Sequence, residues 1–311
     1  MKKTGLSLCM AAFAASVALL DAQTGVSGVF FVEGWESGTL SGSFNSTYYG
    51  TLSSSQFRVQ NSVVGSGNWA FEHRLPAGVP APSIQYATQH FGDAPAGPVP
   101  ASGRGEHFHD LYVQYKIAYS PGFTFQNRSS PTLKQLIIGT QDNRRHDDPC
   151  CNPWVAHYMT IYPPQPAEVH LLAEANNKQA ATGQWIGFTQ NVGGFSPSNP
   201  FLIQAGRFYT VEVRRGLNDP GQDNGIFQMW IDGTLLSDYR SVRYRVPFNG
   251  SFGADVAYGT NFVMISDYVG EPVASDQSVY YDDVKISTRY IGLGSAGISP
   301  PMAPANVRLI R

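Results

Sequence analysis

The last third of the chain alternates apolar and polar residues in short runs, which are Arg207–Arg215, Gly225–Asp232, Asn261–Tyr268 and Ser278–Thr288. In the second run, Phe227, Met229 and Ile231 fall on one face, while Gln228 and Trp230 fall on the other. A period of two is that of a β-strand with one buried face. The pattern therefore predicts an all-β protein built as an antiparallel sandwich of two sheets.

Similar runs extend this prediction towards the N-terminus. They predict a first strand within Gly25–Ser55 and further strands at Gln56–Val63, Asn68–Leu75, Asp110–Ser120, Thr132–Gly139, Val155–Tyr162 and Ala167–Glu174. The segment Pro76–Gly105 is rich in Pro and Gly, and we expect it to be a long loop that forms one wall of a binding cleft.

Composition agrees with many short strands joined by tight turns. The 311 residues include 32 Gly, 21 Pro, 16 Tyr and 18 Phe, and only 14% are charged. The formal net charge is −2 and no run of Lys or Arg is present, so the basic surface that binds nucleic acid or anionic membrane is not expected.

The N-terminal segment Met1–Ala22 has the features of a signal peptide. Lys2 and Lys3 precede an apolar stretch, and Leu20-Asp21-Ala22 offers a cleavage site. We therefore expect a secreted or periplasmic protein whose mature chain is monomeric and does not insert into a membrane. Residues 23–292 would form one β-jelly-roll domain, and residues 293–311 a flexible tail.

Two adjacent cysteines, Cys150 and Cys151, remain in the mature chain. An oxidising compartment favours a vicinal disulfide, although the peptide bond holds the two Cα atoms only about 3.8 Å apart and the ring would be strained. Free thiols are a second interpretation. A metal site with His146, Asp147 and Asp148 is a third, but its spacing fits no familiar zinc motif.

The strand Asp110–Ser120 carries an unusual polar face. Leu111, Val113, Tyr115, Ile117 and Tyr119 share one face, and Tyr112, Gln114 and Lys116 share the other. Tyr, Gln and Lys in a row form a surface that can stack on a sugar, hydrogen-bond to it and attract a carboxylate. An ordinary exposed sheet face is the alternative interpretation. Arg214, Gln228 and Trp230 would extend the same surface if their strands are neighbours.

The chain resembles bacterial concanavalin A-like jelly rolls, above all the group of polysaccharide lyases that act on alginate, glucuronan and heparin. The segments that carry the resemblance are Leu111–Ile117, Ser120–Phe123, Lys134–Gly139, Trp230–Gly233, Tyr280–Ser287 and Tyr290–Gly292. They occur in the expected order over about residues 28–292, and they report strands and turns more than chemistry.

The resemblance implies β-elimination of a uronic-acid polymer in a cleft over a concave sheet. This reaction needs a group that neutralises the uronate carboxylate, a base and an acid. Gln114 lies where the neutralising residue is expected, and His73, His157 and Tyr158 are candidates for proton transfer. The chain lacks the Arg-x-Glu-Leu-Arg, Gln-Ile-His and Tyr-Phe-Lys-Ala-Gly segments of well-known alginate lyases. Alginate specificity is therefore not expected.

Two loops complete the set of candidate residues. Gln141–Pro153 contains Arg144 and Arg145, which we expect at the rim of the cleft, where they would bind substrate. Asn218–Gly225 is rich in oxygen ligands, so a structural calcium ion is one interpretation and a hairpin turn is the other. No other cofactor is expected.

Two functions follow from the sequence. The first is a lyase, which needs Gln114, a His and a Tyr around one small volume. The second is a non-catalytic carbohydrate-binding module or adhesin, which needs only stacking and hydrogen-bonding groups along a groove.

Overall fold

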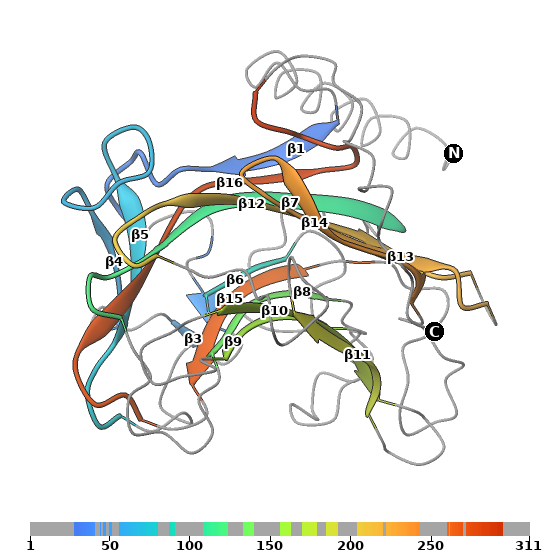
Figure 1. Cartoon of the computed structure of the whole chain (residues 1–311). Helices are drawn as coiled ribbons and strands as arrows, with labels where there is room; N and C mark the ends of the chain where they lie inside the picture. Colours follow the sequence, from blue (N-terminus) through green and yellow to red (C-terminus); the bar gives the residue numbers. More distant parts are fainter. Residues whose placement is uncertain are drawn as a thin grey trace, which may run out of the picture.

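The computed structural model describes residues 28–40, 44, 46–47, 50–51, 56–79, 87–90, 108–123, 133–139, 156–162, 170–178, 185–191, 204–219, 222–242, 260, 262–269 and 272–294. In 156–162, 170–178 and 185–191 it gives only the course of the backbone. The described residues form two antiparallel β-sheets and no helix (Figure 1). The all-β sandwich predicted from alternation is confirmed.

The first sheet has eight strands. Their order is β14 (Thr234–Val242), β13 (Gly225–Ile231), β12 (Tyr209–Gly216), β7 (Asp110–Tyr119), β16 (Gln277–Ser287), β5 (Ala70–Leu75) and β4 (Phe57–Gln60). β1 (Val29–Glu33) also pairs with β16. The C-terminal strand β16 thus lies in the middle of the sheet, between β7 and β5.

The second sheet also has eight strands. Their order is β11 (Trp185–Asn191), β10 (His170–Lys178), β9 (Ala156–Tyr162), β8 (Leu133–Gly139), β15 (Phe262–Val269), β6 (Ala87–His90), β2 (Ser46–Thr47) and β3 (Gly50–Thr51). Here too a late strand, β15, is inserted between two early ones. Such crossovers are typical of a jelly roll.

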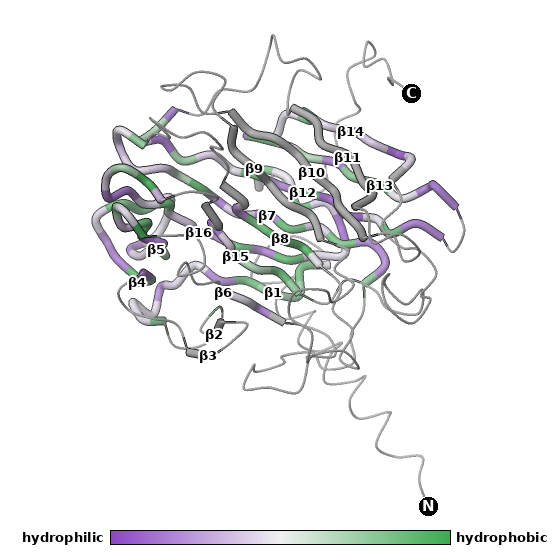
Figure 2. The backbone as a smooth tube through the Cα atoms, turned by 90° about the horizontal axis from the view of Figure 1, so that it is seen from below, coloured by the Kyte–Doolittle hydropathy of each residue, from purple (hydrophilic) through white to green (hydrophobic). Residues whose placement is uncertain are grey.

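The two sheets bend in the same direction, with the second sheet on the inside of the bend (Figure 1). The outer face of the second sheet is therefore concave, and the outer face of the first is convex. Figure 2 shows apolar segments concentrated within the sheets and polar segments at many of the surrounding turns.

The core lies between the sheets and is built from the predicted apolar face of each strand. Phe227, Met229 and Ile231 are buried in it, as are Val113 and Ile117 of β7. Across from them, Leu136, Ile138, Val263 and Ile265 come from the second sheet. Side chains of both sheets thus interdigitate in one apolar layer, which leaves two outer faces for function.

Five strands were missed by the sequence interpretation, namely the short strands β2 and β3 together with β6, β11 and β14. β6 lies inside Pro76–Gly105, which was predicted to be a continuous loop. Its four residues are too few to show a period of two, and prolines lie nearby, but pairing with β15 and β2 stabilises it. β11 and β14 were also not predicted, although β14 pairs with β13 directly after a tight turn. Among the described residues, no helix is long and apolar enough to cross a membrane.

Candidate functional site

The outer face of the first sheet brings the predicted polar residues together. Tyr112, Gln114 and Lys116 of β7 pair with Arg214, Glu212 and Thr210 of β12, and Arg214 and Glu212 pair in turn with Gln228 and Trp230 of β13. The expectation that these strands are neighbours is confirmed. The face is the convex one, however, whereas the sequence interpretation placed it on a concave surface. The roles of these residues in sugar binding stay predictions.

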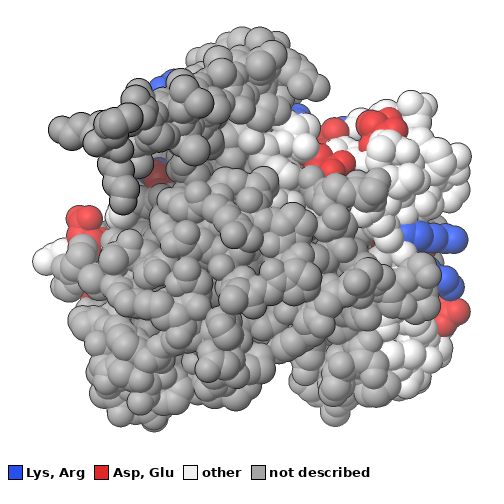
Figure 3. Space-filling model, turned by 180° about the vertical axis from the view of Figure 1, so that it is seen from behind, with Lys and Arg blue, Asp and Glu red and all other residues white. Residues whose placement is uncertain are grey.

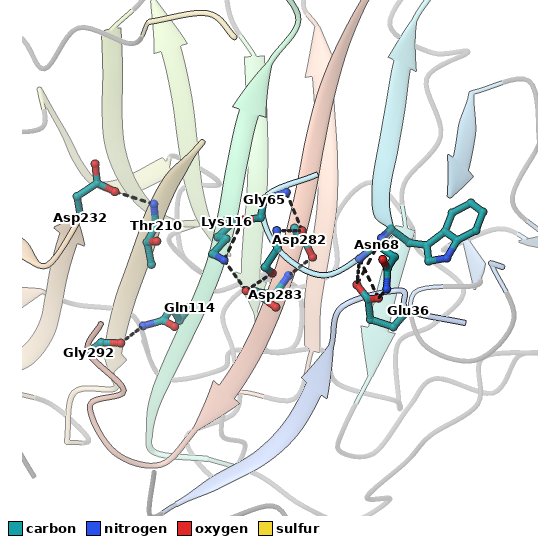
Figure 4. Close-up of polar contacts among 12 residues, drawn as sticks. Glu36, Gly65, Asn68, Gln114, Lys116, Thr210, Asp232, Asp282, Asp283 and Gly292 are labelled. Carbon is teal, nitrogen blue, oxygen red and sulfur yellow. Dashed lines mark hydrogen bonds and ion pairs between the residues drawn. The ribbon is translucent and has the colours of Figure 1, made fainter. Parts of the chain in front are cut away.

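A hollow of about 190 Å³ opens on this face, and we call it the Lys285 hollow. It is lined by Gln114, Lys116, Thr210, Asp283, Lys285 and residues 291–294. Lys116 Nζ lies 2.7 Å from Asp283 Oδ2 and donates to Gly65 O at 3.2 Å (Figure 4). The Lys285 ammonium has no ion pair or hydrogen bond within the described part of the chain. Lys285 therefore presents a cation that an acidic ligand could neutralise.

Gln114 and Glu212 hold the end of the domain against the sheet. The Gln114 amide donates to Glu212 Oε2 at 3.1 Å and to Gly292 O at 2.7 Å. Glu212 also accepts from the backbone N–H groups of Ile291 and Gly292, at 2.7 and 2.9 Å. Burial raises the pKa of Glu212, and these hydrogen bonds oppose the rise. Because both Gln114 amide hydrogens are engaged, neutralising a uronate would require Gln114 to exchange one of these partners.

Trp230 is covered by aromatic rings rather than exposed. Only 1% of it is accessible, and its ring centroid lies 5.0 Å from that of Tyr290 and 6.3 Å from that of Tyr112. Stacking of a sugar on Trp230 therefore requires Tyr290 to move. Burial raises the pKa of Tyr112 and of Tyr290 to about 12 each. Both hydroxyls are neutral at physiological pH, so neither is prepared to act as a base.

Arg214 forms a network at the edge of the same face. It donates from Nε to Asp110 Oδ1 at 3.0 Å and from Nη1 to Gln228 Oε1 at 3.1 Å, and its guanidinium lies over the ring of Tyr112. Gln228 in turn donates to Asp238 Oδ1 at 3.1 Å. These polar groups already satisfy one another, so this edge is ordered before any ligand binds.

Three carboxylates anchor the loop between β4 and β5 beside the Lys285 hollow. Asp282 Oδ2 accepts from the N–H groups of Gly65 and Ser66, both at 2.9 Å, and Ser66 Oγ donates to Asp283 Oδ2 at 2.6 Å. Glu36 accepts from Asn68 N–H at 3.0 Å (Figure 4). Burial raises the pKa of Asp282 to about 6. The sequence interpretation missed this anchor, because its partners are far apart in the chain.

His73 lies in the core between the sheets. His73 Nδ1 is 2.8 Å from Asp267 Oδ2, and the Tyr281 hydroxyl donates to Asp267 Oδ1 at 2.7 Å. All three side chains are fully buried. Asp267 and Tyr281 were not predicted as partners. The signal was present, because each is a polar residue two positions from core residues, Ile265 and Val279.

The candidate residues of β9 lie in the second sheet. Register pairs His157 with the core residue Ile138, and it pairs Tyr158 with Ile137 of β8 and Glu174 of β10. The Tyr158 position is thus on the outer, concave face. The Ala156–Asn176 pair is two register positions away and therefore lies on the same face. The structure does not bring Gln114, His73 and Tyr158 around one volume. They belong to the convex face, the core and the concave face, respectively.

The remaining candidates divide into two groups. Arg144, Arg145, Cys150 and Cys151 lie outside the described residues. In the Asn218–Gly225 turn, Asn218 donates to backbone oxygens, and Asp219 and Asn224 hydrogen-bond to each other at 2.8 Å. This pattern is that of a hairpin turn. The described part of the chain contains no group of three or more His, Cys, Asp or Glu side chains that could hold a metal.

Comparison with known proteins identifies the fold. No protein-family model matches the chain, and no curated protein matches it. Among solved structures, the endo-β-1,4-glucuronan lyase of the fungus Trichoderma reesei matches with a TM-score of 0.53 at 13% identity, over 83% of this chain and 94% of the lyase. A mutant of the alginate lyase Aly36B in complex with an alginate tetrasaccharide matches with a TM-score of 0.52 at 14% identity, over 76% and 84%. The chain therefore has the two-sheet jelly-roll fold found in these polysaccharide lyases.

Proposed function

We propose that the protein is a secreted or periplasmic polysaccharide lyase that cleaves a uronic-acid polymer by β-elimination on the concave face of the second sheet. The observation that carries this proposal is the position of Tyr158. Register places it on β9, well inside that sheet, on the side opposite the core. The lyase-like fold supports the same conclusion by analogy.

Tyr158 is the residue to which we assign proton transfer. Elimination removes the proton beside the uronate carboxylate and protonates the leaving oxygen, and a tyrosine can take part in both steps. Asn176 is our choice for the neutralising group, because its register position is on the face of Tyr158 and an amide can donate hydrogen bonds to a carboxylate. Gln114 would then contribute on the other side of the molecule, where polymer binding is its remaining role.

The test is the Tyr158→Phe variant, which keeps the ring and removes the ionisable hydroxyl. We expect its turnover of oligoglucuronate to fall by about 10² or more, the usual scale for losing an acid or base catalyst. Formation of the unsaturated uronate product is followed by ultraviolet absorbance. Tyr290→Phe, which removes a hydroxyl from the convex face, is the matched control and should keep the wild-type rate. Full turnover by Tyr158→Phe would exclude Tyr158 from the chemistry.

A non-catalytic carbohydrate-binding protein is the second candidate. The convex face favours it, because the described part of that face offers the Lys285 ammonium in the Lys285 hollow, while burial raises the pKa values of Tyr112 and Tyr290. Such a surface binds without moving protons. If the wild-type protein bound polyuronates but cleaved none of them, this function would replace the lyase proposal.

A further inference from the structure

A second hollow lies on the convex face, near the opposite end of β16 from the Lys285 hollow. It measures about 260 Å³, and we call it the Arg74 hollow. Its lining comes from β4, β5, the segment after β7 and the start of β16, and it includes Arg58, Glu72, Arg74, Ser120, Asp276 and Ser278. Nothing in the sequence interpretation pointed to this place.

Of the two acidic groups of the Arg74 hollow, Glu72 is buried and neutralised, whereas Asp276 is exposed and keeps room for further hydrogen bonds. The Glu72 carboxylate is 4% exposed, forms an ion pair with Arg58 and accepts from Ser278 Oγ at 2.6 Å. Asp276 accepts from the backbone N–H of Ala77 at 2.8 Å. A buried carboxylate held by two donors fixes the shape of the wall and leaves little negative charge to attract a cation.

Arg74 is the cation that remains. It occupies an outward position on β5, between the core residues His73 and Leu75, and register pairs it with Ser278. Within the described residues, its guanidinium has no hydrogen bond or ion pair. The Arg74 guanidinium is therefore available to a ligand, and its planar fork of N–H donors suits a carboxylate.

We propose that the Arg74 hollow is an accessory binding site for an acidic sugar unit, on the face opposite the proposed catalytic one. The Arg74 guanidinium would bind the carboxylate in a bidentate manner. The Ser120 hydroxyl and Asp276 would bind sugar hydroxyls, and the rings of Pro76 and Pro121 would pack on the C–H face. The choice of ligand rests on the proposed function, whereas the site itself rests on the hollow and its free guanidinium.

The experiment is a calorimetric titration with an oligoglucuronate in a background that does not consume it, Tyr158→Phe. We expect two bound oligomers per chain. Adding Arg74→Gln should weaken one of them about tenfold or more, as expected for loss of a charged hydrogen-bonding pair. Arg240→Gln has the same charge change on β14, at the other edge of the sheet, and should leave both sites unchanged. Melting temperatures confirm that each variant is folded.

The outcomes separate the two proposals. If both sites bind the oligoglucuronate equally well with and without Arg74→Gln, the accessory-site proposal is wrong. The lyase proposal is tested separately, by cleavage with the wild-type protein. If the wild type cleaves nothing, the titration is done on the wild-type background, and an Arg74-dependent site still supports the accessory site. A neutral cello-oligosaccharide should not occupy the site. If inorganic sulfate alone binds there as tightly as the oligoglucuronate, the hollow is a simple anion site and the proposal fails.

Discussion

At the scale of single residues, the most unusual group on the convex face is Asp282. Its side chain is fully buried, yet it faces no cation directly, and its partners are the backbone N–H groups of Gly65, Ser66 and Asp283. Burial is the largest influence on this carboxyl and raises its pKa to about 6, while the N–H donors oppose the rise. The proton is therefore bound more tightly in the folded protein than in the unfolded chain, where an Asp titrates near about 3.9.

This difference predicts how stability depends on pH. The protonated Asp282 carboxyl stabilises the folded protein, and this contribution to the free energy of unfolding is fully present below the unfolded pKa. It is lost as the pH rises through the folded pKa near 6, and the loss is about 3 kcal/mol for a shift of this size. Urea unfolding of the wild type and of Asp282→Asn at about pH 4 and pH 7 measures it. The wild type should lose more stability between the two values than the variant. Equal losses would show that Asp282 titrates normally.

Residue roles were harder to predict than residue positions. Alternation placed Gln114 and Trp230 on the outward side of their strands, and register agrees. It could not show that Tyr290 covers Trp230 or that the Gln114 amide donates to Gly292 O, because both partners come from a turn that is distant in the chain. Pattern along one strand reports which face a side chain takes, not what lies above it.

At the scale of elements, residues 290–292 act as a strap across the convex face. Their attachment depends on one buried carboxylate, Glu212, which accepts from two backbone N–H groups of the strap and from Gln114. Tyr290, the first residue of the strap, covers Trp230. The strap therefore determines whether the aromatic cluster and the Lys285 hollow are accessible to a polymer.

Glu212→Ala should release the strap. Removing the acceptor leaves the two strap N–H groups and the Gln114 amide without their partner, so we expect a loss of about 3 kcal/mol in unfolding free energy. Acrylamide should then quench tryptophan fluorescence more strongly, and Trp230→Phe in the same background should abolish the increase. Glu212→Gln, which keeps one acceptor oxygen, should have a smaller effect. Unchanged quenching in Glu212→Ala would mean that other contacts hold the strap.

Strands were predictable where a long run of the sequence alternates apolar and polar residues. β7, β12, β13 and β16 meet this condition, and their predicted positions are confirmed. β6 does not, because a strand of four residues gains its stability from pairing with β15 and β2 rather than from its own pattern. Elements stabilised by neighbours distant in sequence leave little signal in the sequence itself.

At the scale of the whole molecule, the two sheets are joined by polar contacts as well as by apolar packing. Asp267 of β15 meets His73 and Tyr281 of the first sheet, and Gln135 of β8 donates to the Tyr119 hydroxyl of β7. Figure 3 shows described acidic and basic side chains close to one another at the right of that view, and further acidic ones at its left edge. Inside the molecule, a few buried polar contacts fix how the two layers meet.

Asp267 should be the most sensitive of these buried contacts. Burial raises its pKa, while the contacts with His73 and Tyr281 lower it, so the carboxyl depends on both partners. Asp267→Ala leaves a buried imidazole and a buried hydroxyl without their acceptor, and breaking a buried pair in this way costs about 3–5 kcal/mol. Urea unfolding measures the loss. The triple variant His73→Phe, Asp267→Leu, Tyr281→Phe removes every polar partner at once and should recover much of it, because no group is left unpaired. If Asp267→Ala were as stable as the wild type, the layers would be held by apolar packing alone. If the triple variant were no more stable than Asp267→Ala, the loss would come from disturbed packing rather than from unpaired polar groups.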